Sequence, residues 1–363
     1  MALIVASSVA ILLYLLLISL FIRGWNRILL IDPIEKELSN RSISLILCVR
    51  NEANRLPILI EALKRQTTQD FELVWVDDHS DDNSLQIMES TRAVFSKVQI
   101  IRSSGRGKKA AQAEGIMAAT GSLILTTDAD CIPHDGWVAT MLRYYDEHPA
   151  DLLIGSVKMI SDGSWLSRLQ QLDFLTLVAS GMGAAGIGMP IFCNGANMAF
   201  SKQQWLDSRA DMHEEELSGD DVFLLHSIKR RGGRIEVVKS TEAMVLTPTK
   251  ATLKAFLHQR RRWASKRPQF SDPHLLFTAL TVSMVNLLMP VLLIASLFDA
   301  ALWGALFVLF LSKLAVDGVF LMQVRSFFQV KLSPVLVLFF AMVYPLYVVV
   351  GGLTAIVRKQ KAW

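Results

Sequence analysis

Long apolar runs lie at both ends of the chain. The first covers residues 2–22 and contains no charged residue. The later runs cover residues 275–298, about 300–322, and 335–357. Each is long enough for a helix that crosses a hydrocarbon layer roughly 30 Å thick. The run at 300–322 contains Lys313 and Asp317 one helical turn apart, so it can span only if these side chains pair or face protein.

The first apolar run has the features of a permanent membrane anchor. No basic residue precedes it and no small-residue cleavage site follows it, which argues against a cleaved signal peptide. Arg23 and Arg27 lie just beyond it, so the positive-inside rule places residues 24–274 in the cytoplasm. Three further crossings would leave the basic residues 358–361 outside, against the same rule. A re-entrant segment is therefore an alternative for the last run, which contains a proline and a Gly-Gly pair.

The middle of the chain has a different pattern. Short runs rich in branched apolar residues predict strands at residues 43–49, 71–77, 97–102, 122–128 and 151–157. The segments between them have helical apolar spacing, as at Leu56, Leu59, Ile60 and Leu63. Nearly continuous apolar strands that alternate with helices favour an α/β fold, in which a parallel sheet is covered on both faces.

Composition supports a protein with membrane content, since 52% of the 363 residues are apolar. We predict a transmembrane anchor at 1–23, a cytoplasmic α/β domain at 40–270 and about three transmembrane helices at 275–357. We expect an integral, multi-pass protein of a bacterial inner membrane. Three cysteines without a CxxC spacing fit a reducing compartment. The net charge of +4 suits anionic lipid, and the sequence contains no nucleic-acid motif, so we expect no nucleic-acid partner.

Acidic residues follow the predicted strands at the edge where ligands bind parallel sheets. The strand ends carry polar residues at 50–52, 77–82 and 128–130. Asp128 and Asp130, two positions apart, can approach one divalent cation, and oxygen ligands suit Mg²⁺ or Mn²⁺. Such a cation would hold a diphosphate. The alternative is that these acids are turn or cap residues, which is the commoner fate of an isolated Asp-x-Asp.

Three further segments carry candidate chemistry. Residues 103–115 place two glycines and three cations at a helix start, where N–H groups and a lysine can meet a phosphate, although a basic loop would look similar. Asp220 and Asp221 open another helix, as cap and first-turn acids or as a carboxylate base. Cations surround Trp263 just before a membrane segment, where lipid head groups are the alternative partner.

In this order, the segments resemble the membrane-bound glycosyltransferases of family 2, the GT-A-fold group that includes cellulose and hyaluronan synthases and ceramide glucosyltransferase. The similarity covers about residues 40–270. It is carried by "CVRNE" (with Cys48 in place of the family's proline), "VDD", "GKKAA", "DAD", "GDD" and "QRRRW". Motifs in a fixed order are far more specific than any one alone.

The resemblance implies a role for each matching residue. Asp221 is the expected base and Arg262 assists departure of the leaving group. Asp128 and Asp130 are the expected ligands of Mg²⁺ or Mn²⁺. The residues expected to bind substrate are Val49, Glu52, Asp77, Asp78, Lys108, Asp128, Asp220, Gln259 and Trp263.

These roles imply a reaction. The donor would be a nucleotide diphospho-sugar, a UDP-sugar in particular, whose leaving group builds negative charge on the β-phosphate. One base and a direct displacement would invert the anomeric configuration. Four candidate crossings are few for a translocation channel, so single transfer to a membrane lipid is favoured over processive polymer synthesis. A catalytically silent membrane scaffold is a further alternative, against which the retained acids argue.

A dinucleotide-like fingerprint, "GMGAAG", occupies residues 181–186, and Asp207 follows at a fitting distance. A Rossmann oxidoreductase is the alternative that it raises. No strand-helix-strand unit surrounds the motif, and residues 165–192 are mostly apolar. We therefore predict a close-packed or interfacial helix here, where small residues allow tight approach.

Overall fold

A computed structural model describes residues 1–31, 41–212, 219–264 and 271–357. The chain divides into two compact units. The α/β unit comprises residues 28–162, 190–249 and 362–363; the apolar helical unit comprises residues 1–27, 163–189 and 250–361. Residues 163–189 and 250–264 group with the apolar helices, and the predicted domain bounds of 40–270 stay a prediction.

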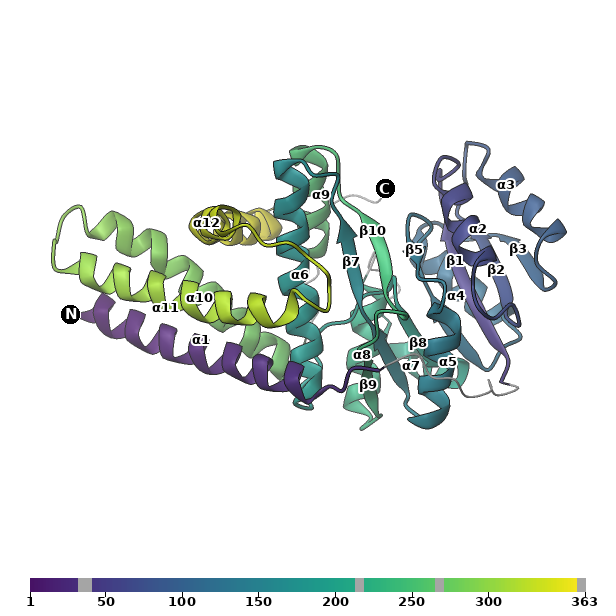
Figure 1. The fold of residues 1–363 in the computed structure, drawn as a ribbon, viewed down its shortest axis with the longest axis horizontal. Helices are drawn as coiled ribbons and strands as arrows, with labels where there is room; N and C mark the ends of the chain where they lie inside the picture. Colours follow the sequence, from purple (N-terminus) through teal and green to yellow (C-terminus); the bar gives the residue numbers. More distant parts are fainter. Residues whose placement is uncertain (32–40, 213–218, 265–270, 358–363) are drawn as a thin grey trace. The chain divides into compact units, whose positions relative to one another are not determined.

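The α/β unit is built on a seven-stranded sheet in the order β3-β2-β1-β4-β8-β6-β9 (Figure 1). Its strands are β1 (Ile43–Val49), β2 (Glu72–Asp77), β3 (Val98–Arg102), β4 (Leu123–Thr126), β6 (Leu152–Gly155), β8 (Met198–Ser201) and β9 (Ile235–Val238). Every neighbouring pair is parallel except those made by β8, which runs antiparallel to β4 and β6. The predicted α/β fold with a mainly parallel sheet is confirmed, and the antiparallel strand is an addition to it.

A smaller sheet has the order β5-β10-β7. It is formed by β5 (Ile132–Pro133), β7 (Val157–Ile160) and β10 (Val245–Pro248). β5 begins two residues after Asp130, and Leu246 of β10 pairs with Ile132. The small sheet therefore holds in place the residues that follow Asp128 and Asp130 in the sequence.

Helices cover the large sheet of this unit. They are α2 (Leu56–Lys64), α3 (Ser84–Ser90), η1 (Thr91–Ala93), α4 (Lys108–Ala118), α5 (Trp137–Glu147), α7 (Lys202–Ser208), η2 (Arg209–Asp211) and α8 (Asp220–Arg230). All six residues of β2 are buried, so both faces of the strand are covered, as predicted. Leu56, Leu59 and Leu63 of α2 are buried, as the helical spacing predicts.

The apolar helical unit contains six helices in the part of the chain that the structure describes. They are α1 (Ala2–Arg27), α6 (Trp165–Gly186), α9 (Leu253–Ala264), α10 (Pro273–Ala295), α11 (Leu302–Val324) and α12 (Pro334–Val357). By length and composition, α1, α10, α11 and the Pro334–Gly351 part of α12 could cross a membrane. Residues 358–361 lie outside the described residues, so the orientation of the last segment stays a prediction.

Lys313 and Asp317 form an ion pair within α11, as the apolar run requires. The Tyr14 hydroxyl of α1 donates to Asp317 Oδ1 at 2.7 Å. Lys313 also lies over the Tyr14 ring, 5.2 Å from its centroid. The predicted pairing is confirmed, and it joins α11 to α1 in the apolar unit.

The "GMGAAG" segment forms the end of α6 and not a strand-turn-helix, so the Rossmann alternative is wrong. Its glycines allow α6 to approach α1. A Cβ added at Gly183 would lie 2.4 Å from the Phe21 carbonyl oxygen, and one at Gly24 would lie 1.8 Å from that of Gly183. The predicted close-packed helix is confirmed.

Gly183→Leu is expected to destabilise the apolar helical unit. Its Cβ would meet backbone atoms of α1, which cannot move aside as a flexible side chain can. Overpacking of this kind typically costs roughly 1–3 kcal/mol of unfolding free energy. Thermal unfolding in detergent measures the loss. Gly304→Leu in α11, where nothing lies within 4 Å of the added Cβ, is the matched control, and an equal loss there would contradict the interpretation.

Candidate active site

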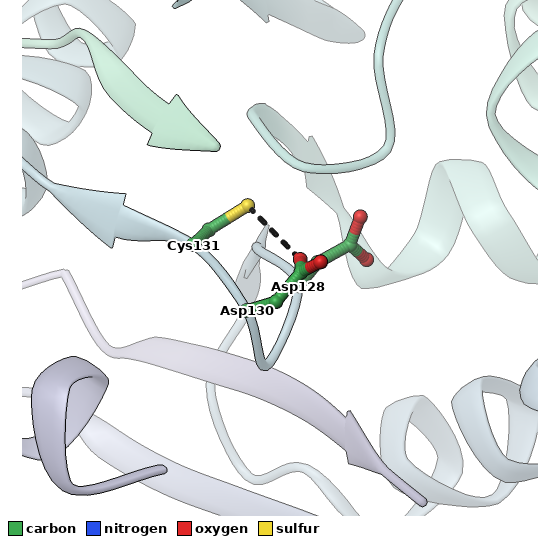
Figure 2. A group of neighbouring side chains, drawn as sticks. All are labelled: Asp128, Asp130 and Cys131. Atoms are coloured by element: carbon green, nitrogen blue, oxygen red, sulfur yellow. Dashed lines mark hydrogen bonds between the residues drawn. The ribbon is translucent and has the colours of Figure 1, made fainter. Parts of the chain in front are cut away.

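The turn after β4 carries the predicted metal ligands. Asp128, Asp130 and Cys131 each offer one donor atom, and these atoms lie within 4.8 Å of one another (Figure 2). The Cys131 N–H donates to the Asp128 carbonyl at 3.0 Å, which closes the turn. The Cys131 thiol lies 3.8 Å from Asp130 Oδ1. The turn thus holds the two carboxylates at one edge of the large sheet.

The donors of this turn fit a hard divalent cation. Mg²⁺ and Mn²⁺ prefer carboxylate oxygens, which Asp128 and Asp130 supply. Burial, and then the charges of these two acids, raise the pKa of the Cys131 thiol well above its ordinary value. Sulfur is a soft ligand and these cations are hard, so the two carboxylates are the pair that would hold the ion.

Lys108 begins α4 and forms an ion pair with Asp128. Burial tends to lower the pKa of Lys108, but the Asp128 carboxylate outweighs it and the net shift is upward. Lys108 is therefore charged at neutral pH. Cys48, at the position of the family's proline, adjoins both groups, and burial raises its pKa to about 12. Its thiol is not a nucleophile at neutral pH.

The loop before α4 does not offer all the N–H groups that the sequence indicated for a phosphate. The Glu114 carboxylate accepts from the N–H groups of Ser104, at 3.0 Å, and Gly105, at 3.1 Å. Burial opposes the charge of Glu114, but these hydrogen bonds prevail and lower its pKa. Gly107, with φ of 94°, donates its N–H to Asp78 at 2.9 Å. The N–H groups of Ser104, Gly105 and Gly107 thus donate within the protein, and phosphate binding at this helix start stays a prediction.

Asp77 and Asp78, at the end of β2, are buried and shape the neighbouring loops. Asp77 Oδ1 accepts from the Ser80 N–H at 3.2 Å. Besides Gly107, Asp78 faces the Arg50 guanidinium, 3.7 Å away. The contact with Gly107 places Asp78 next to the start of α4 and Lys108. The predicted contact of Asp77 and Asp78 with a nucleotide stays a prediction.

Val49 and Glu52, at the end of β1, occupy different environments. The Val49 side chain is buried, and its carbonyl accepts from the Asp78 N–H at 2.8 Å. Glu52 forms an ion pair with Arg55 at 2.8 Å, and its N–H donates to the Ser84 hydroxyl at 2.9 Å. A role for either in substrate binding stays a prediction.

Asp221 lies in the first turn of α8 and close to the end of β4. Its Oδ2 accepts from the Gly195 N–H at 3.0 Å, and its Oδ1 accepts from the Val222 N–H at 2.9 Å. The Thr126 hydroxyl, at the last residue of β4, donates to the Gly195 carbonyl at 2.8 Å. Because a carboxylate has about four acceptor sites, both oxygens can accept a further proton or hydrogen bond. Gly195 therefore connects the candidate base Asp221 to Thr126, the last residue of the strand that leads to Asp128.

Asp220 is more enclosed than its neighbour. It is buried, and its Oδ1 lies 3.5 Å from the Lys109 ammonium. The Cys193 thiol donates to the Asp221 carbonyl at 3.2 Å, and burial followed by the Asp221 charge raises the pKa of that thiol. The Asp220 carboxylate thus faces a lysine of the protein. Substrate binding by Asp220 stays a prediction.

The "QRRRW" residues Gln259, Arg262 and Trp263 lie on α9 in the apolar helical unit. The buried Arg260 lies 4.3 Å from the Trp263 ring centroid, and its guanidinium is 2.6 Å from the Asp173 carboxylate on α6. Burial raises the pKa of Asp173, against the effect of Arg260. These residues and the strand-end acids thus belong to different compact units, and the predicted contact of Trp263 with an acceptor stays a prediction.

Several residues that contact the predicted site residues within either unit were not singled out from the sequence. Lys109 follows the motif lysine directly, and the doubled lysine was its only signal. Arg260 lies at a variable position of the "QRRRW" segment. Nothing in the pattern indicated that Glu114 would return to the loop at 103–105, because that contact depends on how α4 packs.

Residues 44–207 match the family described as Glycosyl transferase family 2. The glycosyltransferase GlyG of Streptococcus pneumoniae is 31% identical over 136 residues, which cover 36% of this chain and 45% of that protein. The chain therefore spans less than half the length of this relative. The undecaprenyl-phosphate 4-deoxy-4-formamido-L-arabinose transferase of Proteus mirabilis is 26% identical over 77% of this chain and 80% of its own.

A solved structure agrees on the fold. The mannosyltransferase PcManGT of Pyrobaculum calidifontis, in complex with GDP-Man and Mn²⁺, aligns over 99% of this chain and 98% of its own, with a TM-score of 0.57 and 16% identity. The GT-A fold expected from the motifs is confirmed. Residues 44–207 are therefore similar to the family 2 glycosyltransferases, and the fold agrees with that similarity.

Proposed function

We propose that this protein is an inverting glycosyltransferase that moves a sugar from a nucleotide diphospho-sugar to a membrane lipid. One observation carries the proposal: the Asp128–Asp130 turn, Lys108 and Asp221 lie together in the α/β unit. Lys108 pairs with Asp128, and Thr126 and Gly195 link the strand before that turn to Asp221. A charge-stabilising group and a base at one sheet edge are what direct displacement needs.

The donor side is formed by Asp128, Asp130 and Lys108. A divalent cation held by the two acids would stabilise the charge that develops on the leaving diphosphate. Lys108 is charged and close enough to exchange its contact with Asp128 for one with a phosphate. A UDP-sugar remains the donor that we expect.

The acceptor side depends on Asp221, which would take the proton of the attacking hydroxyl. A lipid acceptor is supported by the four apolar helices and by the lipid named for the Proteus mirabilis relative. That lipid carries a phosphate, so the hydroxyl acceptor proposed here differs from it in the reacting group. Membrane insertion of these helices with the α/β unit in the cytoplasm would bring a lipid-borne hydroxyl to the enzyme. Four candidate spans in the described part of the chain favour single transfer over polymer export.

A panel of radiolabelled sugar nucleotides tests the proposal. Membranes that contain the protein are incubated with each donor, and the lipid extract is counted. We expect label from one donor to enter the lipid fraction. Label that appears in polymer would support a processive synthase, and no transfer from any donor would support a silent scaffold.

Trp263→Ala and Arg262→Ala are expected to separate acceptor binding from catalysis. If Trp263 packs on the acceptor, its loss raises the KM for the lipid more than that for the sugar nucleotide. If Arg262 faces the diphosphate, its loss mainly lowers kcat, because the interaction grows as the leaving group departs. Steady-state kinetics with both substrates varied measure the two effects.

Arg261→Ala is the matched control, because Arg261 is an exposed cation on the same helix. We expect it to leave the kinetic constants near wild type. If the segment only attracts anionic lipid, loss of Arg261 or Arg262 would cost about 1 kcal/mol of surface attraction, and the kinetic constants of all three variants would stay near wild type.

A further inference from the structure

Two consecutive lysines at the start of α4 face different acids. Lys108 pairs with Asp128 on the donor side, whereas the Lys109 ammonium lies 3.5 Å from Asp220 Oδ1. Successive residues of a helix point roughly 100° apart, so one turn can serve two partners. Asp220 directly precedes the candidate base Asp221.

The Lys109–Asp220 pair is shielded from water. The two side chains are 12% and 9% exposed, and the Phe223 ring covers the ammonium at 4.9 Å from its centroid. Exposed pairs of this kind contribute little, but a buried charge that loses its partner is strongly destabilising. Loss of either member is therefore expected to destabilise the other.

Other charged or titratable groups also face Asp220. Lys108 of α4 and Cys48 of β1 both interact with it electrostatically. The positive charges of Lys108 and Lys109 thus offset the negative charges of Asp128 and Asp220. Loss of Lys109 would leave an excess of negative charge next to Asp221.

We infer that Lys109 is a positioning residue, which fixes the first turn of α8 through Asp220 and thereby holds the Asp221 carboxylate in place. Lys109 is not assigned a contact with the acceptor hydroxyl or with the leaving diphosphate. Its effect is transmitted through the buried ion pair and the peptide that joins Asp220 to Asp221. The ion pair stands on the geometry alone, while its effect on turnover rests on the proposed function.

A double-mutant cycle on the full-length protein in detergent tests the pair. Lys109→Met and Asp220→Asn are each expected to lower the midpoint of thermal unfolding by several degrees, because each removes one charge of a buried ion pair. The double variant Lys109→Met with Asp220→Asn should unfold at a higher temperature than either single variant. Effects that simply add would overturn the inference.

Turnover separates positioning from stability. With the donor found in the panel, Lys109→Met is expected to lower kcat on the order of tenfold at an almost unchanged donor KM, and the double variant, which lacks the same ion pair, should be little slower than Lys109→Met alone. A raised donor KM with normal kcat would instead assign Lys109 to donor binding and overturn the inference.

The exposed pair Lys97 and Asp70 provides the matched control. Its atoms lie 2.7 Å apart, but the side chains are 60% and 77% exposed. Lys97→Met and Asp70→Asn should show no coupling in either measurement. If wild type transfers no sugar from any donor, the proposed function fails, while the unfolding cycle still supports or overturns the ion pair.

Discussion

Asp221→Asn is expected to keep sugar-nucleotide binding and to lose turnover by on the order of 10²-fold or more. Asparagine has nearly the same shape, but its amide cannot take a proton from an acceptor hydroxyl. It retains one of the two backbone hydrogen bonds from Gly195 and Val222, so a small loss of stability is also expected. Donor binding measured beside kcat distinguishes the two effects.

Asp207→Asn is the control for this substitution. Asp207 is exposed and accepts a hydrogen bond from Gln203 at 2.7 Å, so the variant makes the same chemical change away from the site. It should have normal turnover. An Asp221→Asn protein that loses binding and turnover equally would show that Asp221 is a structural cap, and wild-type turnover would remove it from the mechanism.

Removal of divalent cations is expected to abolish transfer, and Mn²⁺ or Mg²⁺ should restore it. The physical reason is the charge that develops on the diphosphate, which Lys108 alone would not balance. The measurement is label incorporation with chelator, followed by titration of each metal. Full activity in chelator would contradict a metal role for Asp128 and Asp130.

A pair of substitutions localises that metal effect. Asp130→Asn should lower both activity and its response to added Mn²⁺, since it removes one of two expected ligands. Asp135→Asn, a few residues on, changes an acid that is paired with Arg65 at 3.1 Å and is 47% exposed. An equal loss in both variants would assign the effect to the loop as a whole.

The sequence was informative where a pattern repeats over several residues. Apolar strands and helical spacing predicted β1, β2, β3 and β4 nearly to their observed ends. The antiparallel strand β8 was not predicted, because Met198–Ser201 lacks the branched apolar residues that mark the predicted strands. Its direction depends on pairing with β4 and β6, which are distant in sequence.

The candidate site, like the fold, could be predicted from the sequence only in part. Sequence motifs predicted which acids stand at strand ends, and the structure brings Asp128, Lys108 and Asp221 into one unit. The partner of each polar group could not be predicted. Glu114 takes loop N–H groups that looked available for phosphate, and Lys109 takes Asp220, because both contacts depend on how α4 packs.

The most direct test of the central claim compares wild type with Asp221→Asn in one experiment. Membranes with equal amounts of each protein receive the labelled sugar nucleotide selected by the panel, and label is measured in the lipid extract, the polymer fraction and the aqueous phase. We predict label in the lipid extract of wild type, and a lipid signal lower by on the order of 10²-fold with Asp221→Asn at unchanged donor binding. Equal lipid labelling by the two proteins, or none by wild type, would contradict the proposed lipid glycosyltransferase.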